Sequence, residues 1–280
     1  MRVHDLSMPI WEGAGYGEIL PITNSSVRFI EYLYYERHGL RETMYKVDGE
    51  SGSPLMVAMQ LAPFNREPIQ PNPKHLLTVD QIPIEDLVLR ETVVVDVPAQ
   101  PGHEITEDEM TAALERSDFR RGDEVLLRTG WGSRERAFTM GLDYFKNTPC
   151  LKHAAGLALA RVMEAMDSHI FMTDCALVNP PRVQGNNWFT GDKPYVPLPK
   201  PWPSAEARER MLRLRTQVHD SVHDTREPSS YGAIIRTALA GCKCLVDCHQ
   251  ISGRRCRTII LPLKIRDGGA SPCRFFALED

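Results

Sequence analysis

Hydrophobic residues along the chain switch between helical spacing and short continuous runs. After Thr106, apolar residues recur every three or four positions, which predicts a helix. Thr106 and Glu109 have the spacing of a capping box, in which each side chain satisfies an amide at the start of the helix. The same periodicity predicts a helix over about 151–166 and another that begins after Ser204.

Between the predicted helices lie apolar runs of strand length, bounded by turn residues such as Gly122. Because strands alternate with helices, the pattern predicts an α/β fold with a mixed sheet flanked by helices. One domain over 1–280 accounts for the length, since a chain of this size can form a single large core. The predicted strands cover 92–97, 124–129, 168–174, 241–251 and 258–265.

One apolar run, from Leu55 to Leu61, has hydrophobic residues on every second position. If the run is extended, Leu55, Val57, Met59 and Leu61 share one face. Two interpretations remain open at this point. The run is either a strand with core on both faces, or the hydrophobic wall of a pocket.

A proline-rich segment, 179–203, interrupts the alternation. Proline removes backbone donors and holds the chain extended, so the segment is neither a helix nor a central strand. Long ordered loops in compact domains are often functional, which favours a lid over a pocket, with Trp188 facing the ligand. The alternative is a surface connection whose aromatic residues anchor it to the body.

Composition narrows the class of protein. The chain has 280 residues, 42% of them hydrophobic, and a net charge of −4 with both signs spread along it. With this balance of charges, the sequence has no cluster of basic residues that would indicate binding to nucleic acid. No apolar run is long enough to span a membrane. The seven cysteines suggest reduced thiols, and no apolar signal segment follows Met1, so we expect a cytoplasmic protein.

Several motifs, taken in order, resemble the cyclase family of metal-dependent hydrolases, which includes kynurenine formamidases. The resemblance extends over most of the chain and implies a cyclase-type α/β fold, of the swivelling β/β/α kind. It also implies a small-molecule substrate and assembly as a homodimer or homotetramer. The motifs are Asp5-Leu6-Ser7-x-Pro9, the segment 79–88, Arg121-Gly122-Asp123-Glu124 through Thr129-Gly130-Trp131, Leu261-Pro262-Leu263, and Ser271-Pro272-x-Arg274.

The family's metal-binding run reads His-x-Gly-Thr-His-x-Asp-x-Pro-x-His. When it is aligned on Pro63, this chain has Leu55, Met59, Leu61 and Asn65 at the four ligand positions. Alkyl and thioether groups are poor ligands for a hard divalent cation. The resemblance therefore implies that the fold is kept without the family's metal or any other cofactor. Gln60 and Asn65 are then candidate polar groups for orienting a substrate.

A second family motif places a glutamate twelve residues after a histidine. Here Asp247 corresponds to the glutamate and Ile235 to the histidine. The carboxylate is therefore retained, on a side chain that is one methylene shorter. On a strand, Asp247 and His249 would project from the same face and provide a base and an acid. Alternatively, Asp247 pairs with an arginine and His249 caps the end of the strand.

Cysteines close to Asp247 raise a metal alternative. Cys242, Cys244, Cys248 and His249 include soft ligands, but they lack the Cys-x-x-Cys spacing that is typical of structural zinc sites. On a strand the cysteines would share one face as small buried hydrophobic residues. We therefore expect no zinc at this position.

The glycine-rich segment after Trp11 is a candidate entrance to the site. The family uses aromatic residues here to close the pocket, which implies roles for Trp11 and Tyr16. Tyr16 would donate a proton or polarise a carbonyl group, whereas Trp11 would line the substrate. Simple packing of Trp11 beneath the loop is the alternative.

Together these patterns lead us to expect a metal-independent acid–base enzyme. Its substrate would be a small, largely apolar carbonyl compound that undergoes cyclisation, hydration or elimination in a biosynthetic pathway. Asp247, His249 and Tyr16 would carry the proton transfers, and Leu55, Met59, Leu61 and Trp188 would form the wall. Two alternatives remain: a metal-dependent amide or lactone hydrolase, and a catalytically inactive ligand-binding homologue.

Overall fold

The computed structural model describes residues 1–12, 27–57, 77–180, 229–235 and 237–279. Its centre is an eight-stranded mixed sheet in which β5, β7, β9 and β10 run parallel. Strand β12 pairs with both β11 and β4, so seven strands close into a barrel, and β1 extends the sheet along β12. The strands are β1 (Arg2–Asp5), β4 (Pro54–Val57), β5 (Val88–Asp96), β7 (Glu124–Arg128), β9 (Ile170–Thr173), β10 (Ala240–Cys242), β11 (Arg255–Pro262) and β12 (Ala270–Glu279).

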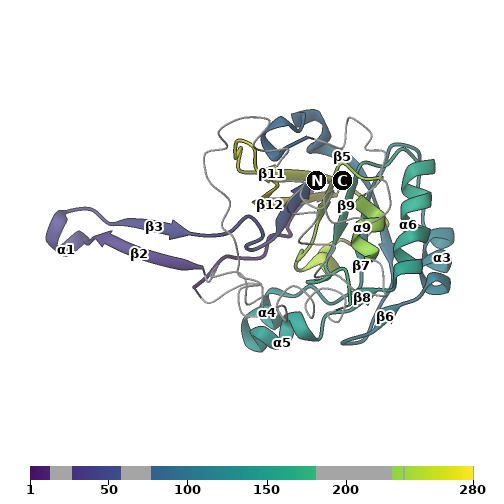
Figure 1. The fold of residues 1–280 in the computed structure, drawn as a ribbon, viewed down its shortest axis with the longest axis horizontal. Coiled ribbons are helices and arrows are strands. Elements are labelled where there is room, and N and C mark those ends of the chain that lie inside the picture. The colour runs from purple at the N-terminus through teal and green to yellow at the C-terminus, as the bar shows by residue number, and fades with distance from the viewer. Residues whose placement is uncertain (13–26, 58–76, 181–228, 236, 280) are drawn as a thin grey trace, which may run out of the picture.

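Helices cover the outer face of the parallel strands (Figure 1). The longer helices pack on the sheet through a hydrophobic core, and the shorter elements lie in the connections between strands. They are α3 (Glu107–Arg116), α4 (Arg134–Met140), α5 (Leu142–Lys146), α6 (His153–Ala165) and α9 (Ser230–Ile235), with 3₁₀ helices η4 (Val79–Gln81), η5 (Ile84–Asp86) and η6 (Cys248–Gln250), and the strand pair β6 (Glu104–Ile105) and β8 (Cys150–Leu151). None of the helices in these ranges is long and apolar enough to cross a bilayer.

Two hydrophobic cores lie on opposite faces of the barrel wall. The inner core includes Leu55 and Val57 of β4 together with residues from the other six barrel strands. The outer core includes Met56, between Leu55 and Val57 in sequence, and joins the sheet to α3, α6 and α9. This alternation follows from the two-residue period of a strand. It confirms that Leu55 and Val57 share a face.

A long two-stranded arm projects from the body (Figure 1). It consists of β2 (Arg28–Leu33), the short helix α1 (Tyr35–His38) and β3 (Glu42–Lys46), and β2 pairs only with β3 among the described strands. Gly39, with φ of 73°, ends α1 in the left-handed region.

The mixed α/β fold predicted from the sequence is confirmed, and so are two of its helices. Thr106 and Glu109 form the predicted capping box at the start of α3, with the Thr106 amide donating to Glu109 Oε2 at 2.8 Å. Helix α6 occupies the range predicted at 151–166. The predicted helix after Ser204 and nearly all of the proline-rich segment 179–203 lie outside the described residues.

The predicted strand over 241–251 is wrong. Strand β10 ends at Cys242, and Cys244 and Asp247 take left-handed backbone conformations with φ of 58° and 57°. Left-handed residues interrupt a ladder, so the chain turns and then enters η6. Asp247 and His249 are therefore not neighbours on one face of a strand.

Candidate active site

The four parallel strands direct their carboxyl ends toward one edge of the barrel. In α/β sheets this edge is where polar residues most often gather into a site. The segments that follow β7, β9 and β10 are joined here by hydrogen bonds to one another and to the N-terminal segment after β1. Because several loops meet at this edge, side chains distant in sequence become neighbours.

The loop 244–247 is held by its own backbone amides. The amides of Cys244 and Leu245 donate to carbonyls of the segment around β9, at 2.9 and 3.2 Å, and the Val246 amide donates to Leu6. The Asp247 amide donates to the carbonyl of Gly132, in the loop after β7, at 2.8 Å. Each donor has a separate acceptor, so the position of Asp247 is fixed from several sides.

Asp247 forms an ion pair with Arg134, at the first position of α4. The Arg134 amide donates to Asp247 Oδ1 at 3.2 Å, and the guanidinium Nε lies 3.5 Å from Oδ2. The carboxylate is 15% exposed, so it is accessible but only narrowly. The pairing matches the alternative in which Asp247 contacts an arginine. His249, in η6, is exposed to solvent.

Asp174, directly after β9, organises the loop that holds Asp247. Its fully buried carboxylate accepts from the Thr129 amide at 2.8 Å, the Thr129 hydroxyl at 2.7 Å and the Gly130 amide at 2.9 Å. Burial raises the pKa of Asp174, and the hydrogen bonds from Thr129 and the glycine amides partly offset that rise. The same loop contains Gly132, where a Cβ would overlap Leu245 and Asp174.

A bidentate ion pair ties β5 and β7 to the segment after Asp247. Arg128 donates to the two carboxylate oxygens of Asp96 at 2.6 and 2.9 Å, and hydrogen bonding to Asp96 raises the pKa of Arg128. The remaining Arg128 nitrogen donates to the carbonyls of Cys248 and Ile251. This contact fixes η6, and with it the position of His249.

Trp11 lies beside this edge and packs mainly on protein. Its ring centroid is 4.5 Å from that of Phe138, and it contacts the small apolar cluster that contains Trp131 and Tyr144. This contact agrees with the packing interpretation of Trp11. The other predicted site residues Tyr16, Met59, Gln60, Leu61, Asn65 and Trp188 lie outside the described residues.

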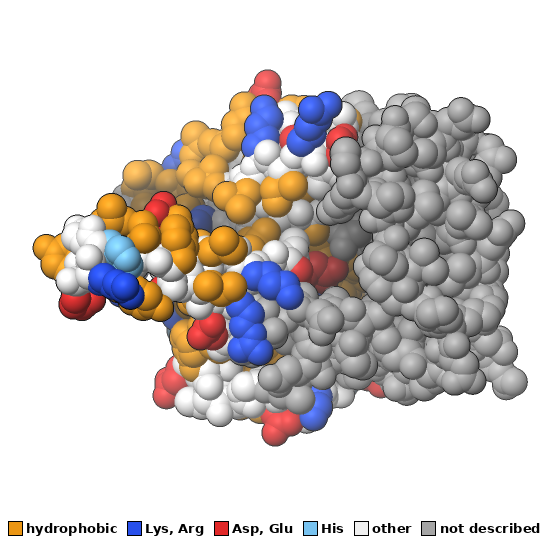
Figure 2. All heavy atoms as spheres, turned by 60° about the vertical axis from the view of Figure 1, so that its left-hand side comes forward, with side chains coloured by type: hydrophobic (Ala, Val, Ile, Leu, Met, Phe, Trp, Pro, Cys, Tyr) orange, Lys and Arg blue, Asp and Glu red, His pale blue; other side chains and the backbone are white. Residues whose placement is uncertain are grey.

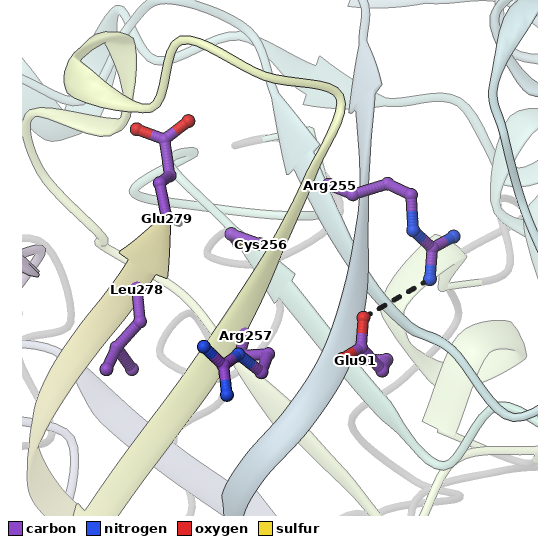
Figure 3. A pocket seen from close by; sticks show the side chains of 6 residues that line it. All are labelled: Glu91, Arg255, Cys256, Arg257, Leu278 and Glu279. Carbon is purple, nitrogen blue, oxygen red and sulfur yellow. Dashed lines mark hydrogen bonds and ion pairs between the residues drawn. The ribbon is translucent and has the colours of Figure 1, made fainter. Parts of the chain in front are cut away.

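A cavity of about 340 Å³ lies elsewhere in the described part of the molecule (Figure 3). It is lined by Glu91, Arg255, Cys256, Arg257, Leu278 and Glu279, none of which the sequence predicted as functional. Arg255 pairs with Glu91 and with Asp123, so the charge in this cavity is balanced internally. Internal pairing favours a structural role for these side chains.

A comparison with protein families identifies a part of the chain that is similar to a known family. A family model described as a putative cyclase matches residues 66–176, which contain β5, β7 and β9. This part of the chain is similar to the cyclase family. The matched segment begins directly after Asn65, so it includes three of the barrel strands and leaves out the run that aligns with the metal ligands.

Solved structures share the fold over the whole chain. Isatin hydrolase A from Labrenzia aggregata is 18% identical with a TM-score of 0.64, covering 99% of this chain and 93% of its own. Isatin hydrolase A from Ralstonia solanacearum is 20% identical with a TM-score of 0.62, covering 100% and 92%. A predicted metal-dependent hydrolase from Bacillus stearothermophilus is 15% identical with a TM-score of 0.58, covering 99% and 97%. At sequence identities of 20% or below, these similarities show that the fold is shared and do not show a shared activity. No curated protein sequence matches the chain.

The described residues do not fit the metal that the cyclase family implies. Leu55, at the first ligand position, is fully buried among hydrocarbon side chains of the inner core. Ile235, at the position of the upstream histidine, is buried in the outer core, on the other side of the barrel wall. An uncompensated cation among such groups would cost many kcal/mol. Across the described ranges, no group of three histidine, cysteine or acidic residues is placed to hold an ion.

The cysteines near Asp247 also separate in space. Cys242 and Cys248 pack in the inner core, whereas Cys244 packs in the cluster around Trp131. Burial raises the pKa of the Cys242 and Cys248 thiols well above the ordinary value, which keeps them protonated. They contribute as small apolar side chains.

The sequence did not reveal three residues that shape this site. Arg134 contacts Asp247 across 113 positions, and no local pattern marks that pairing. Asp174 was predicted only as the end of a strand, because its contacts with Thr129 and Gly130 span 45 and 44 positions. Arg128 was predicted as a strand residue, without its contact to Asp96.

Proposed function

We propose that this cyclase-family protein is an enzyme that performs acid–base chemistry on a small, largely apolar carbonyl compound without the family's metal. Ring closure, water addition and elimination all belong to this class of reaction. Such reactions depend on positioned proton donors and acceptors, and a Lewis acid is one means among several of stabilising the developing charge.

The single observation that carries the proposal is the burial of Leu55. It occupies the position of the first metal ligand and lies completely inside the hydrophobic core of the barrel. Met59 and Leu61 replace the next two ligands with side chains that also lack a donor suited to a divalent cation. The loss extends over the run and is not confined to one position.

Asp247 is the proposed base. Its carboxylate is fixed by the loop 244–247 and is only narrowly exposed, which suits a group that accepts a proton from a bound substrate. The guanidinium of Arg134 holds the carboxylate in place and would also stabilise a neighbouring negative charge on a substrate oxygen. We propose His249 or Tyr16 as the proton donor.

The remaining predicted contacts form the substrate pocket in this proposal. Trp11, Met59, Leu61 and Trp188 would provide apolar walls, and Gln60 and Asn65 would orient the carbonyl group. Leu55 would support the wall from within the barrel, since its own side chain is enclosed.

A second candidate is a catalytically inactive homologue that binds a ligand. The Asp247–Arg134 pair favours it, because the carboxylate is already engaged by a guanidinium of the same chain. In that case Arg134 and Asp247 would fix the geometry of a pocket that binds a ligand and does not convert it. The metal-dependent hydrolase is the third outcome that an experiment must separate.

The test is turnover of a panel of cyclic amides, lactones and aromatic ketones, measured with and without a strong chelator. Isatin belongs in the panel because isatin hydrolases share the fold. We expect chelator-resistant turnover, and a loss of about 10²- to 10⁴-fold in kcat for Asp247→Asn, the usual contribution of a general base. Asp108→Asn, an exposed acid on α3, is the matched control and should keep full activity.

Other results would decide against the proposal. Turnover that disappears on chelation and returns with added zinc or manganese would favour the hydrolase. Saturable binding of a panel compound with no product would favour the inactive homologue. Full activity of Asp247→Asn would remove the proposed base.

A further inference from the structure

Two polar atoms in the cluster around Trp131 are buried without a hydrogen-bond partner. They are Nε1 of Trp131, in the loop after β7, and the hydroxyl of Tyr144 in α5, and no described residue hydrogen-bonds to either. The two side chains are only 2% and 0% exposed, so bulk water does not reach them. Buried donors without partners are rare because each one destabilises the fold. We therefore expect a molecule outside the chain to supply the acceptor.

The rest of this aromatic pair is firmly held. The Trp131 amide donates to the Thr129 hydroxyl at 3.2 Å, and its carbonyl accepts from Arg136 at 2.7 Å. The Arg136 guanidinium lies over the indole ring, 4.9 Å from its centroid, and the Tyr144 ring stacks on the indole with the ring centroids 5.4 Å apart. The two unpartnered donors therefore belong to side chains that are fixed from several sides.

The cluster around Trp131 lies at the edge of the barrel that holds the candidate site. It contains residues from the segments that follow β1, β7, β9 and β10, and from α4 and α5. Val246 of the cluster directly precedes Asp247, and Gly132, which follows Trp131, accepts a hydrogen bond from the Asp247 amide at 2.8 Å. Trp11, a proposed wall of the substrate pocket, packs against the same cluster.

We propose that Trp131 Nε1 and the Tyr144 hydroxyl bind the carbonyl oxygen of an uncharged, largely apolar ligand. The inference rests on the proposed function in taking this edge of the barrel as the substrate site. A carbonyl oxygen has two lone pairs and can accept from both donors, whereas Nε1 of an indole can only donate. The ligand must therefore present an acceptor. Two neutral donors at this oxygen would also stabilise negative charge that develops on it.

The environment of Tyr144 keeps its hydroxyl a donor. Burial raises the pKa of Tyr144 well above its ordinary value, and nearby Cys244 and Asp174 add to the rise. The hydroxyl therefore keeps its proton throughout the physiological pH range. A charged ligand among these enclosed apolar side chains would lose its hydration without compensation, which favours a neutral carbonyl compound.

The enclosure of the cluster favours a small molecule over a protein partner. Hydrophobic side chains that are open to solvent gather along the projecting arm (Figure 2), whereas those of the cluster around Trp131 are mostly buried. Trp11 and Met140 are the partly exposed residues that pack against the cluster. Trp11 stacks on Phe138, which is itself 51% exposed. A ligand would enter by displacing these outer side chains, without opening the barrel.

The first test compares stability with and without the unpartnered hydroxyl. Tyr144→Phe keeps the ring and removes a buried group that has no partner, so its urea midpoint should be higher than that of wild type. Tyr231→Phe is the matched control, because the Tyr231 hydroxyl is also buried without a partner but lies in the outer core beside Gly241. Its midpoint should rise as well. A lower midpoint for Tyr144→Phe would overturn the proposal, since the hydroxyl would then be bonded in the free protein, for example to an internal water.

The second test detects the ligand at Trp131 and needs no turnover. The probes are indanone and indane, which share a bicyclic carbon frame and differ in the carbonyl group. Isotope labelling of the four tryptophans gives four indole N–H signals, and Trp11→Phe, Trp188→Phe and Trp202→Phe assign that of Trp131 by elimination. Indanone should shift this signal downfield in a saturable manner, and indane should bind at least about 10-fold more weakly.

The same titration on the two tyrosine variants isolates the hydroxyl. Tyr144→Phe should bind indanone about 2- to 10-fold more weakly than wild type, and Tyr231→Phe should bind it equally well. The absence of a saturable shift, equal binding of indanone and indane, or an unchanged affinity in Tyr144→Phe would each overturn the proposal. Saturable binding at Trp131 with no turnover of any panel compound would instead contradict the proposed function and leave this site standing.

Discussion

At the residue scale, Leu55 shows how a strand can keep its shape while its chemistry changes. The alternation along β4 was predictable, and the structure places Leu55 and Val57 inside the barrel with Met56 outside. The sequence could not decide between an enclosed core and an open wall, because both give the same period of two. For Leu55 and Val57 the enclosed core is correct.

Leu55→Ala should lower the free energy of unfolding by about 2–5 kcal/mol, because it removes methyl groups from an enclosed core and leaves a cavity. Urea denaturation measures the loss. Val3→Ala, at an exposed position, should stay within about 0.5 kcal/mol of wild type. A loss for Leu55→Ala as small as that of Val3→Ala would contradict the enclosed position.

Residue patterns could not reveal which groups surround Asp247. Its contact with Arg134 spans 113 positions, and the contacts of Asp174 with Thr129 and Gly130 span 45 and 44. Periodicity reports which face a residue occupies, but not which distant loop lies opposite. The resemblance to the cyclase family identified Asp247 as a candidate, while its partners came only from the fold.

At the scale of elements, prediction succeeded where the local sequence signal was strong. Helix α3 has a capping box at its start, and α6 has a long apolar periodicity. The strand predicted at 241–251 failed because the hydrophobic residues after Cys242 are buried in the inner core and in the cluster around Trp131 without pairing in a ladder. Burial and strand pairing give similar sequences but different backbones.

The last strand is fixed by a carboxylate whose titration can be measured. Glu279 at the end of β12 accepts from the amides of Ser252 and Gly253 at 2.9 Å and contacts His4 of β1 at 2.8 Å. Burial raises the pKa of Glu279, but the hydrogen bonds from Gly253, Ser252 and His4 together outweigh it. The net result is a pKa lowered from 4.5 to about 2.

A carboxylate whose pKa is lowered in the folded state stabilises the fold at pH values above its ordinary pKa of 4.5. This stabilisation is lost as the pH falls. The free energy of unfolding should therefore decrease as the pH drops from about 4.5 toward 2. Glu279→Gln should show a smaller decrease between pH 5 and pH 3 in urea titrations, while Glu115→Gln, an exposed acid on α3, should behave like wild type. Equal slopes for Glu279→Gln and wild type would contradict the assignment.

At the scale of the whole molecule, the residues that stabilise the barrel and the residues that form the candidate site lie in different parts of the fold. The outer core with its helices holds the strands together, and the carboxyl ends of the parallel strands gather the polar groups. Leu55, at the first ligand position of the family motif, lies in the inner core. The sequence predicted this architecture through the family resemblance, but it did not predict the arm, whose exposed apolar strands resemble buried ones in composition.

The central claim is that the barrel presents hydrocarbon at the positions where the cyclase family binds an ion. Calorimetric titration of the purified, chelator-treated protein with zinc and then manganese tests it most directly. We predict no saturable site near one ion per chain. Binding of one ion per chain with a Kd below about 1 µM would contradict the account.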